Sequence, residues 1–297
     1  RIPPLVIGLS TYIYFEVQGP IPGYVEGWID WNADGQWTGP EKVVSGVYAP
    51  GRRHRVAVTA PAGTIPGQTF ARFRINSVGL LGSATGPAPN GEVEDHEVRI
   101  EENTYVTKMH YPQLPDPWGW DVYCQSPIIL ADDFQCTSNG LITEVYFWGS
   151  WEDDVIGRIT RMHLSLHSND PGPPSMPAAL LWEYDTDEVV EVRREPDSPQ
   201  GWFEPPAMYW ESNHVAYSLY RVTIPDHLAF EQKEGEIYWL DLQAQTEGGR
   251  WGWKTSICEE FMDDAVWRYD EEPDNWQELF DPIQGEWSLD LAFYING

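Results

Sequence analysis

One loop near the start of the chain has the residue types and spacing of a calcium-binding loop. Between Asp30 and Glu41 the sequence fits the pattern D-x-[DN]-x-[DN]-G-x5-E at every fixed position. In such a loop, alternate oxygen-bearing side chains converge on a hard cation, a glycine permits a sharp turn, and the final glutamate closes the site with two oxygens. The predicted calcium ligands are Asp30, Asn32, Asp34, Gln36 (through its main-chain carbonyl) and Glu41.

The segment before this loop is an expected strand at residues 24–29, not a helix. We therefore expect a calcium loop inside a β-hairpin, where the ion has a structural role and does not act as a switch. The alternative is an ordinary Asp/Asn/Gly turn that binds no metal.

Three pairs of adjacent aspartates could also do chemistry: Asp132/Asp133, Asp153/Asp154 and Asp263/Asp264. Two carboxylates can hydrolyse a glycosidic bond as acid and nucleophile. Neighbours on a strand point to opposite faces, however, so a catalytic pair would need members from different segments. This favours structural or second-cation roles, with solvated surface and catalysis as alternatives.

Other catalytic and metal-binding patterns are missing from the sequence. His163 and His167 lie on an expected strand, which separates them by about 13 Å, too far to share one metal. The sequence has no Gly-x-Ser-x-Gly elbow, phosphate-binding loop or dinucleotide fingerprint. We therefore predict that the protein is not an enzyme.

Aromatic residues give the remaining functional signal. The Pro-rich stretch 168–212 is expected to form long excursions from a compact sandwich, and it contains Trp202, Phe203, Tyr209 and Trp210. Such side chains suit stacking on sugar rings and protein interfaces, although core packing is an alternative. Core packing is expected for the tryptophans inside apolar strand patterns, namely Trp148, Trp239, Trp253 and Trp267.

The composition of the whole chain excludes several classes of protein. The 297 residues include 18 Lys+Arg against 47 Asp+Glu, a net charge of −29, which disfavours binding to nucleic acids and anionic membranes. No apolar run is long enough to span a membrane. The 16 Trp, 15 Tyr, 25 Pro and 26 Gly favour short strands and turns, and so an all-β fold. Because the chain starts at Arg1, we expect a mature or trimmed fragment.

The three cysteines, Cys124, Cys136 and Cys258, lack the spacing of a zinc site. One disulfide, with Cys124–Cys136 the nearest pair in sequence, plus a free thiol is one interpretation. Three reduced, buried thiols are the other.

A composition change after Glu102 predicts two domains, residues 1–102 and 103–297. The first carries a net charge of −3 and 3 Trp, and the second carries −26 and 13 Trp. Alternating apolar runs predict strands at 11–17, 25–29, 54–58, 71–75 and 93–100 in the first domain. The second has candidates at 142–148, 161–167, 179–184, 215–224, 237–243, 264–269 and 289–295. We expect two β-sandwich or jelly-roll-like domains in tandem.

The first domain resembles the GEVED domain, a small β-sandwich module of large secreted bacterial proteins with no known catalytic role. The resemblance rests on the runs GWIDWNADG at 27–35, ARFR at 71–74 and GEVEDHEV at 91–98, where His96 replaces the family's usual aromatic residue. It implies that Asp30, Asn32, Asp34 and Glu41 bind calcium and that Glu92, Glu94 or Asp95 adds to the site. Solvated strand ends are the alternative for these last three.

The second domain, from Trp120 onward, is similar to an uncharacterised domain of secreted bacterial surface proteins. The similar runs are LADDF at 130–134, FWGSW at 147–151, GWKTS at 252–256, DDAVW at 263–267 and DLAF at 290–293. The resemblance implies no function.

Taken together, these features favour a non-enzymatic, secreted or cell-surface protein, stabilised by calcium, with a structural or adhesive role. Its expected partners are copies of itself, in a filament, layer or matrix, or other extracellular proteins. The segment 3–9 is a candidate to pair with a neighbour's open sheet edge. The alternative is a carbohydrate-binding module of a larger secreted protein, and the third hypothesis is a glycan hydrolase or lyase.

Overall fold

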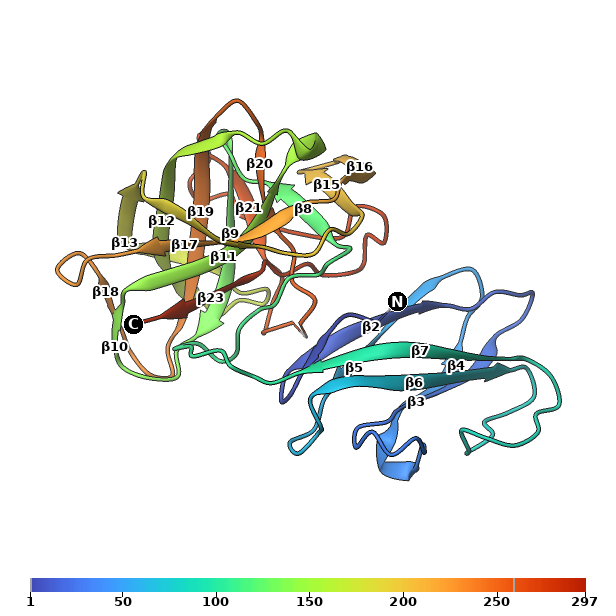
Figure 1. Ribbon diagram of the computed structural model, residues 1–297. Coiled ribbons are helices and arrows are strands. Elements are labelled where there is room, and N and C mark those ends of the chain that lie inside the picture. Colours follow the sequence, from blue (N-terminus) through green and yellow to red (C-terminus); the bar gives the residue numbers. More distant parts are fainter. Residues whose placement is uncertain (1, 259) are drawn as a thin grey trace. The chain divides into compact units, whose positions relative to one another are not determined.

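A computed structural model describes residues 2–258 and 260–297, and the chain divides into two compact units, 1–104 and 105–297 (Figure 1). The boundary predicted from composition lies after Glu102. Among the described residues, the regular structure consists of strands and two short 3-10 turns, η1 (Gly39–Glu41) and η2 (Glu152–Asp154). The all-β prediction is therefore confirmed.

The first unit is a sandwich of two sheets. A five-stranded sheet has the order β1-β7-β6-β3-β4, and a two-stranded sheet pairs β2 with β5, as far as the described residues show. The strands are β1 (Leu5–Val6), β2 (Ser10–Glu16), β3 (Gly23–Ile29), β4 (Lys42–Tyr48), β5 (Arg53–Thr59), β6 (Gly67–Asn76) and β7 (Glu92–Glu101). Ile13 from the small sheet and Ile29 from the large one share a buried core.

The N-terminal segment completes this sheet. Leu5 is buried, and it pairs in parallel with Ile100 of β7. In this structure β1 therefore pairs within its own unit as an edge strand, and pairing of residues 3–9 with a neighbouring molecule stays a prediction.

The glycine at the start of the GEVED run is required by its backbone. Gly91 has φ +102°, and a Cβ built on it would lie 1.8 Å from the carbonyl oxygen of Ile75. Only glycine fits both the dihedral angle and the close approach of β6.

The second unit is a larger sandwich. In the described residues, an eight-stranded sheet runs β14-β17-β11-β20-β8-β15-β16, with β23 also paired to β11. A six-stranded sheet runs β13-β12-β19-β9-β21-β22. The first contains β8 (Trp120–Tyr123), β11 (Glu144–Trp151), β14 (Val189–Arg194), β15 (Gln200–Glu204), β16 (Met208–His214), β17 (Tyr217–Thr223), β20 (Trp251–Lys254) and β23 (Phe293–Asn296). The second contains β9 (Ile128–Gln135), β12 (Arg158–Asp170), β13 (Met176–Thr186), β19 (Ile237–Glu247), β21 (Val266–Tyr269) and β22 (Gln277–Glu278). A further small sheet pairs β10 (Gly140–Ile142) with β18 (Phe230–Gln232).

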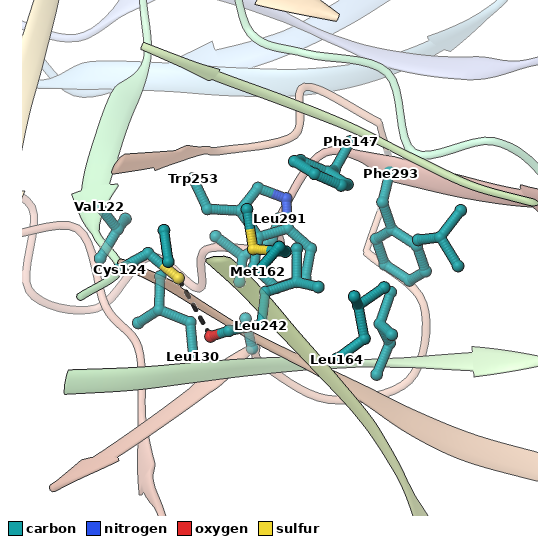
Figure 2. Close-up of a cluster of buried hydrophobic side chains, with 14 of the residues drawn as sticks. Val122, Cys124, Leu130, Phe147, Met162, Leu164, Leu242, Trp253, Leu291 and Phe293 are labelled. Carbon is teal, nitrogen blue, oxygen red and sulfur yellow. Dashed lines mark hydrogen bonds between the residues drawn. The ribbon is translucent and has the colours of Figure 1, made fainter. Parts of the chain in front are cut away.

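Side chains from the two large sheets interdigitate in one core (Figure 2). Phe147 and Trp253 come from the eight-stranded sheet, and Leu164 and Leu242 come from the six-stranded one. Such alternation of inward apolar residues is what holds a sandwich together. Trp148, Trp239, Trp253 and Trp267 are all buried, as expected.

The stretch 168–212 does not form long excursions. It contains the end of β12 and the strands β13, β14 and β15, with part of β16. Proline suggested irregular structure, but Pro205 and Pro206 occupy the turn between β15 and β16 and leave the flanking strands intact.

All three cysteines are free and buried. In Figure 2 the thiol of Cys124 points to the carbonyl oxygen of Leu242, to which it donates at 3.1 Å. The interpretation with three reduced thiols therefore describes this structure.

Candidate functional site

The candidate calcium loop lies in a β-hairpin. Strand β3 ends at Ile29, the loop follows, and η1 leads directly into β4, which pairs antiparallel with β3. The predicted position of the loop between two strands is thus confirmed.

The first acidic residue of the loop is buried and organises the turn. Asp30 is 3% exposed, and its carboxylate accepts the backbone N–H groups of Asp34 at 3.1 Å and Gly35 at 2.8 Å. Gly35 has φ +77°, the left-handed conformation that the sharp turn needs. Asn32 Oδ1 accepts the Asp34 N–H at 3.0 Å, and Asp34 Oδ1 accepts the Gln36 N–H at 2.8 Å. Side-chain oxygens of the loop therefore accept hydrogen bonds from the loop's own backbone.

The last residue of the loop carries an unused acceptor. Glu41 is 3% exposed, and its Oε2 accepts the N–H of Thr38 at 2.7 Å and the Thr38 hydroxyl at 3.0 Å. Its Oε1 is buried and has no hydrogen-bond partner among the described residues. A buried carboxylate oxygen without a donor is costly, and a cation would relieve that cost. The residues present therefore fit a calcium ion.

No group of three or more His, Cys, Asp or Glu side chains in the described residues has the geometry of a metal site. In this loop, backbone N–H groups occupy the carboxylates of Asp30 and Asp34. A group of His, Cys, Asp and Glu side chains leaves out amide, carbonyl and water oxygens, all of which calcium also binds. Calcium binding stays a prediction.

Acidic side chains of the GEVED run contact basic side chains of the same unit. Both oxygens of Asp95 accept from the guanidinium of Arg72, at 2.7 and 2.6 Å, and Arg72 also lies over the ring of Trp37. The Arg72 guanidinium, although burial opposes it, holds the pKa of Asp95 below its usual value. Glu94 lies 3.3 Å from His96, and Glu92 is exposed. These contacts favour a role in the sheet over a role as added calcium ligands.

The four predicted surface aromatics divide into two kinds. Trp202 and Phe203 are buried at 0% and 3% exposure, so an exposed platform is wrong for them; the ring of Trp202 lies against Tyr123, and the ring of Phe203 lies against Trp120. Tyr209 and Trp210 on the edge strand β16 are 42% and 45% exposed. The exposed aromatic edge therefore consists of Tyr209 and Trp210.

The aspartate pairs also differ. Asp132 and Asp133 are buried in β9, whereas Asp153 and Asp154 are exposed in η2. Asp154 accepts the backbone N–H groups of Val215 and Ala216, which is a structural role. Asp263 accepts from the backbone N–H and hydroxyl of Ser175. These contacts do not favour a glycosidase pair.

Models of two protein families match the chain. The GEVED domain model matches residues 24–99, and a model described as a domain of unknown function, DUF7901, matches residues 109–296. The chain belongs to the DUF7901 family. No curated protein matches the chain. Both resemblances expected from the sequence are confirmed, and residues 1–104 and 105–297 are called the GEVED unit and the DUF7901 unit below.

The DUF7901 unit contains a buried polar network that sequence reasoning missed. Asp121 Oδ2 accepts from Lys254 Nζ at 2.9 Å and lies 3.0 Å from His214 Nε2, and all three side chains are fully buried. Burial alone would raise the pKa of Asp121, but the charge of Lys254 and the contact with His214 hold it below its ordinary value. His214 also contacts the Ser150 hydroxyl at 2.8 Å. The Ser150, His214 and Asp121 side chains of this grouping are all buried.

The two histidines of β12 have separate partners in the DUF7901 unit. His163 lies 3.0 Å from Asp185, and His167 lies 3.1 Å from Asp241.

No helix in the described residues has the length and apolar character needed to cross a bilayer.

Proposed function

We propose that the chain is a non-enzymatic, calcium-stabilised part of an extracellular structural or adhesive protein. The observation that carries the proposal is Glu41 Oε1, which is buried without a donor at the closing position of a loop with calcium-ligand spacing. GEVED membership supports a place in a secreted or surface protein.

Calcium would act on this loop by joining its two ends. Asp30 immediately follows β3, and Glu41 immediately precedes β4, so one ion held by both ties the hairpin strands together. The binding energy would come from contacts of the cation with the loop carboxylates, including the unsatisfied oxygen of Glu41. Because the ion binds only the folded loop, it would stabilise the folded state by mass action.

The test is calcium binding by the full chain, followed by titration calorimetry and thermal unfolding. Glu41→Gln keeps the size of the side chain and removes its charge, so it should abolish binding at the loop and the associated rise in Tm. The matched control is Glu16→Gln, an exposed glutamate of the same unit, which should bind as the unmodified chain does. Equal binding by Glu41→Gln and the unmodified chain would contradict the proposal.

Calcium-dependent self-association is a second part of the proposed function. The DUF7901 unit concentrates most of the charge of −29, and divalent cations screen repulsion between such surfaces. Light scattering at rising protein concentration should show larger particles in calcium than in chelator. A monomer under both conditions would remove self-assembly from the proposal and leave the calcium loop intact.

Carbohydrate binding is a second candidate, favoured by the exposed aromatic edge. Tyr209 and Trp210 are neighbours on a strand, so their rings face different sides of the sheet edge, where each could stack on a sugar. A glycan array should show binding that Trp210→Ala reduces and Met208→Ala, at an exposed aliphatic neighbour, leaves unchanged. Absence of binding to every polysaccharide would remove this candidate.

A further inference from the structure

The GEVED unit has an inward sheet face that its smaller sheet covers only in part. The large sheet has five strands, and in the described residues the sheet that packs on it contains β2 and β5 alone. Alternation places Glu92, Glu94, His96, Val98 and Ile100 on one side of β7. Val98 and Ile100 belong to the core, so this side faces inward, yet Glu92 and Glu94 are exposed. One end of this inward face is therefore left open.

A cavity of about 300 Å³ lies at this open end, and it is called the β2 groove below. Residues 13–18 line it along β2, and because these residues are consecutive, the backbone edge of the strand borders the cavity as well as its side chains. Phe73 and Ile75 of β6 and Glu94 and His96 of β7 are also in its lining. The β2 groove thus lies between a strand edge and the uncovered part of the large sheet.

The edge of β2 that borders the groove pairs with no strand of the described chain. β2 pairs antiparallel with β5, from Ser10 opposite Thr59 to Glu16 opposite Arg53, and β5 does not line the groove in the described residues. The groove therefore follows the other edge of β2. A strand edge presents N–H and C=O groups in a row, which is the template for the addition of a strand. A strand added there would extend the small sheet over the open end of β7.

The floor of the β2 groove is apolar and incompletely buried. Phe73 and Ile75 pack against Val17 and Val25 of the core, but each is only partly buried. The ring of Phe73 also makes an edge-to-face contact with His96, with 5.9 Å between the ring centroids. Apolar surface of this kind is removed from water when a partner covers it. The floor therefore favours a partner that brings aliphatic surface.

The exposed charge of the β2 groove is acidic. Glu92 and Glu94 are exposed in its lining, and Glu94 lies 3.3 Å from His96. Arg74 also lines the groove, but it is 4% exposed, and its guanidinium donates to main-chain carbonyl oxygens of the loop 83–86. A partner with Lys or Arg side chains is therefore complementary to this groove in charge.

We propose that the β2 groove binds an extended, basic polypeptide segment of a partner protein, which adds to β2 as a third strand. Its backbone would pair with the edge of β2, and every second side chain would point inward over β7. Lys and Arg suit these inward positions, because their aliphatic stems can cover Phe73 while their charged ends reach Glu92 and Glu94. The inference goes beyond the proposed function, since it stands even if the loop binds no calcium.

Binding of a synthetic peptide to the full chain tests the groove. The probe is a fluorescent peptide that alternates lysine with threonine or valine, and its anisotropy is measured in chelator so that no calcium competes for the carboxylates. The peptide should bind saturably, and the double variant Glu92→Gln with Glu94→Gln should weaken binding by about fivefold through two lost charge pairs. The matched control, Glu97→Gln with Glu101→Gln, removes two charges from the opposite side of β7 and should bind as the unmodified chain does. Equal affinity of all three proteins would overturn the proposal.

Two further peptides distinguish strand addition from charge attraction alone. A fully N-methylated version keeps the lysines but donates no backbone hydrogen bonds, so it should not bind. A version with glutamate in place of lysine should not bind either, because its charge has the same sign as that of the groove. If the N-methylated peptide binds as tightly as the original peptide, strand addition is overturned.

Hydrogen exchange locates the bound peptide on the full chain. The peptide should slow the exchange of backbone amides in β2, and slowing confined to other segments would overturn the assignment to this groove. Glu92 and Glu94 are exposed, so the double variant should keep the Tm of the unmodified chain, and its loss of binding is then not a loss of folding. Dimerisation of the chain in chelator that the double variant weakens, with no peptide binding, would overturn the basic partner and assign the groove to a second copy.

Discussion

At the scale of single residues, the polar groups of this protein differ in whether the chain supplies their partners. Both oxygens of Asp132 accept backbone N–H groups, Oδ2 of Asp121 contacts Lys254 and His214, and Asp95 accepts two hydrogen bonds from Arg72. Several buried carboxylate oxygens, Glu41 Oε1 among them, have no hydrogen-bond partner in the described residues. Glu41 differs from the others because it closes a loop with calcium-ligand spacing, and this combination marks the candidate cation site.

The first residue-scale prediction concerns Gly91. Gly91→Ala should destabilise the GEVED unit by more than about 2 kcal/mol, since the new methyl group would collide with the Ile75 carbonyl at an unfavourable φ. Chemical denaturation measures the loss. Gly79→Ala is the control, because its φ is not positive and a Cβ there meets nothing within 4 Å, so a similar loss in both variants would contradict the explanation.

The second concerns His110. Burial lowers the pKa of His110 to about 3, and its Nδ1 accepts the Gln135 N–H. The unfolded chain then binds a proton that the folded chain does not, so stability should fall as pH drops from 7 to 5, by about 2 kcal/mol from this group. His110→Asn keeps an acceptor and should reduce the dependence of the free energy of unfolding on pH, measured by urea denaturation at several pH values. An unchanged slope would show that His110 does not cause the acid sensitivity.

At the scale of elements, alternation in the sequence predicted where strands run, but it did not predict which strands meet. The runs at 54–58 and 93–100 became β5 and β7, and the metal-loop spacing gave the right hairpin. The sequence did not predict the parallel pairing of β15 with β8, because these segments are far apart in the chain, and it did not predict the burial of Trp202 on β15.

The element-scale prediction concerns β1. Leu5 is buried where β1 joins β7, so Leu5→Ala should destabilise the GEVED unit by about 2–4 kcal/mol through lost burial and a cavity. Ile21→Ala, at an exposed position, should cost less than about 1 kcal/mol. Equal, small effects in denaturation would mean that β1 contributes little to the sheet.

At the scale of the whole molecule, the two units differ in charge, and the proposed calcium loop belongs to only one of them. The acidity of the chain resides mainly in residues 103–297, yet the loop with calcium-ligand spacing lies in the nearly neutral GEVED unit. Bulk charge and specific binding are thus different properties of this chain.

Scanning calorimetry should therefore assign the calcium response of the loop to one unit. Calcium should raise the temperature of the GEVED transition, and Glu41→Gln should remove that shift and leave the DUF7901 transition unchanged, because the ion binds within the GEVED unit. An equal shift of the GEVED transition in Glu41→Gln and in the unmodified chain would contradict binding at the loop.

The three buried thiols give this chain a built-in probe of opening. All of them lie in the DUF7901 unit, and burial raises the pKa of Cys258 to about 11 and of Cys136 to about 12, which leaves little reactive thiolate in the closed state. Alkylation by a water-soluble reagent would thus proceed only through transient exposure of that unit, while the GEVED unit, without cysteine, stays silent. Labelling rates with and without calcium would therefore report the transient opening of the DUF7901 unit alone.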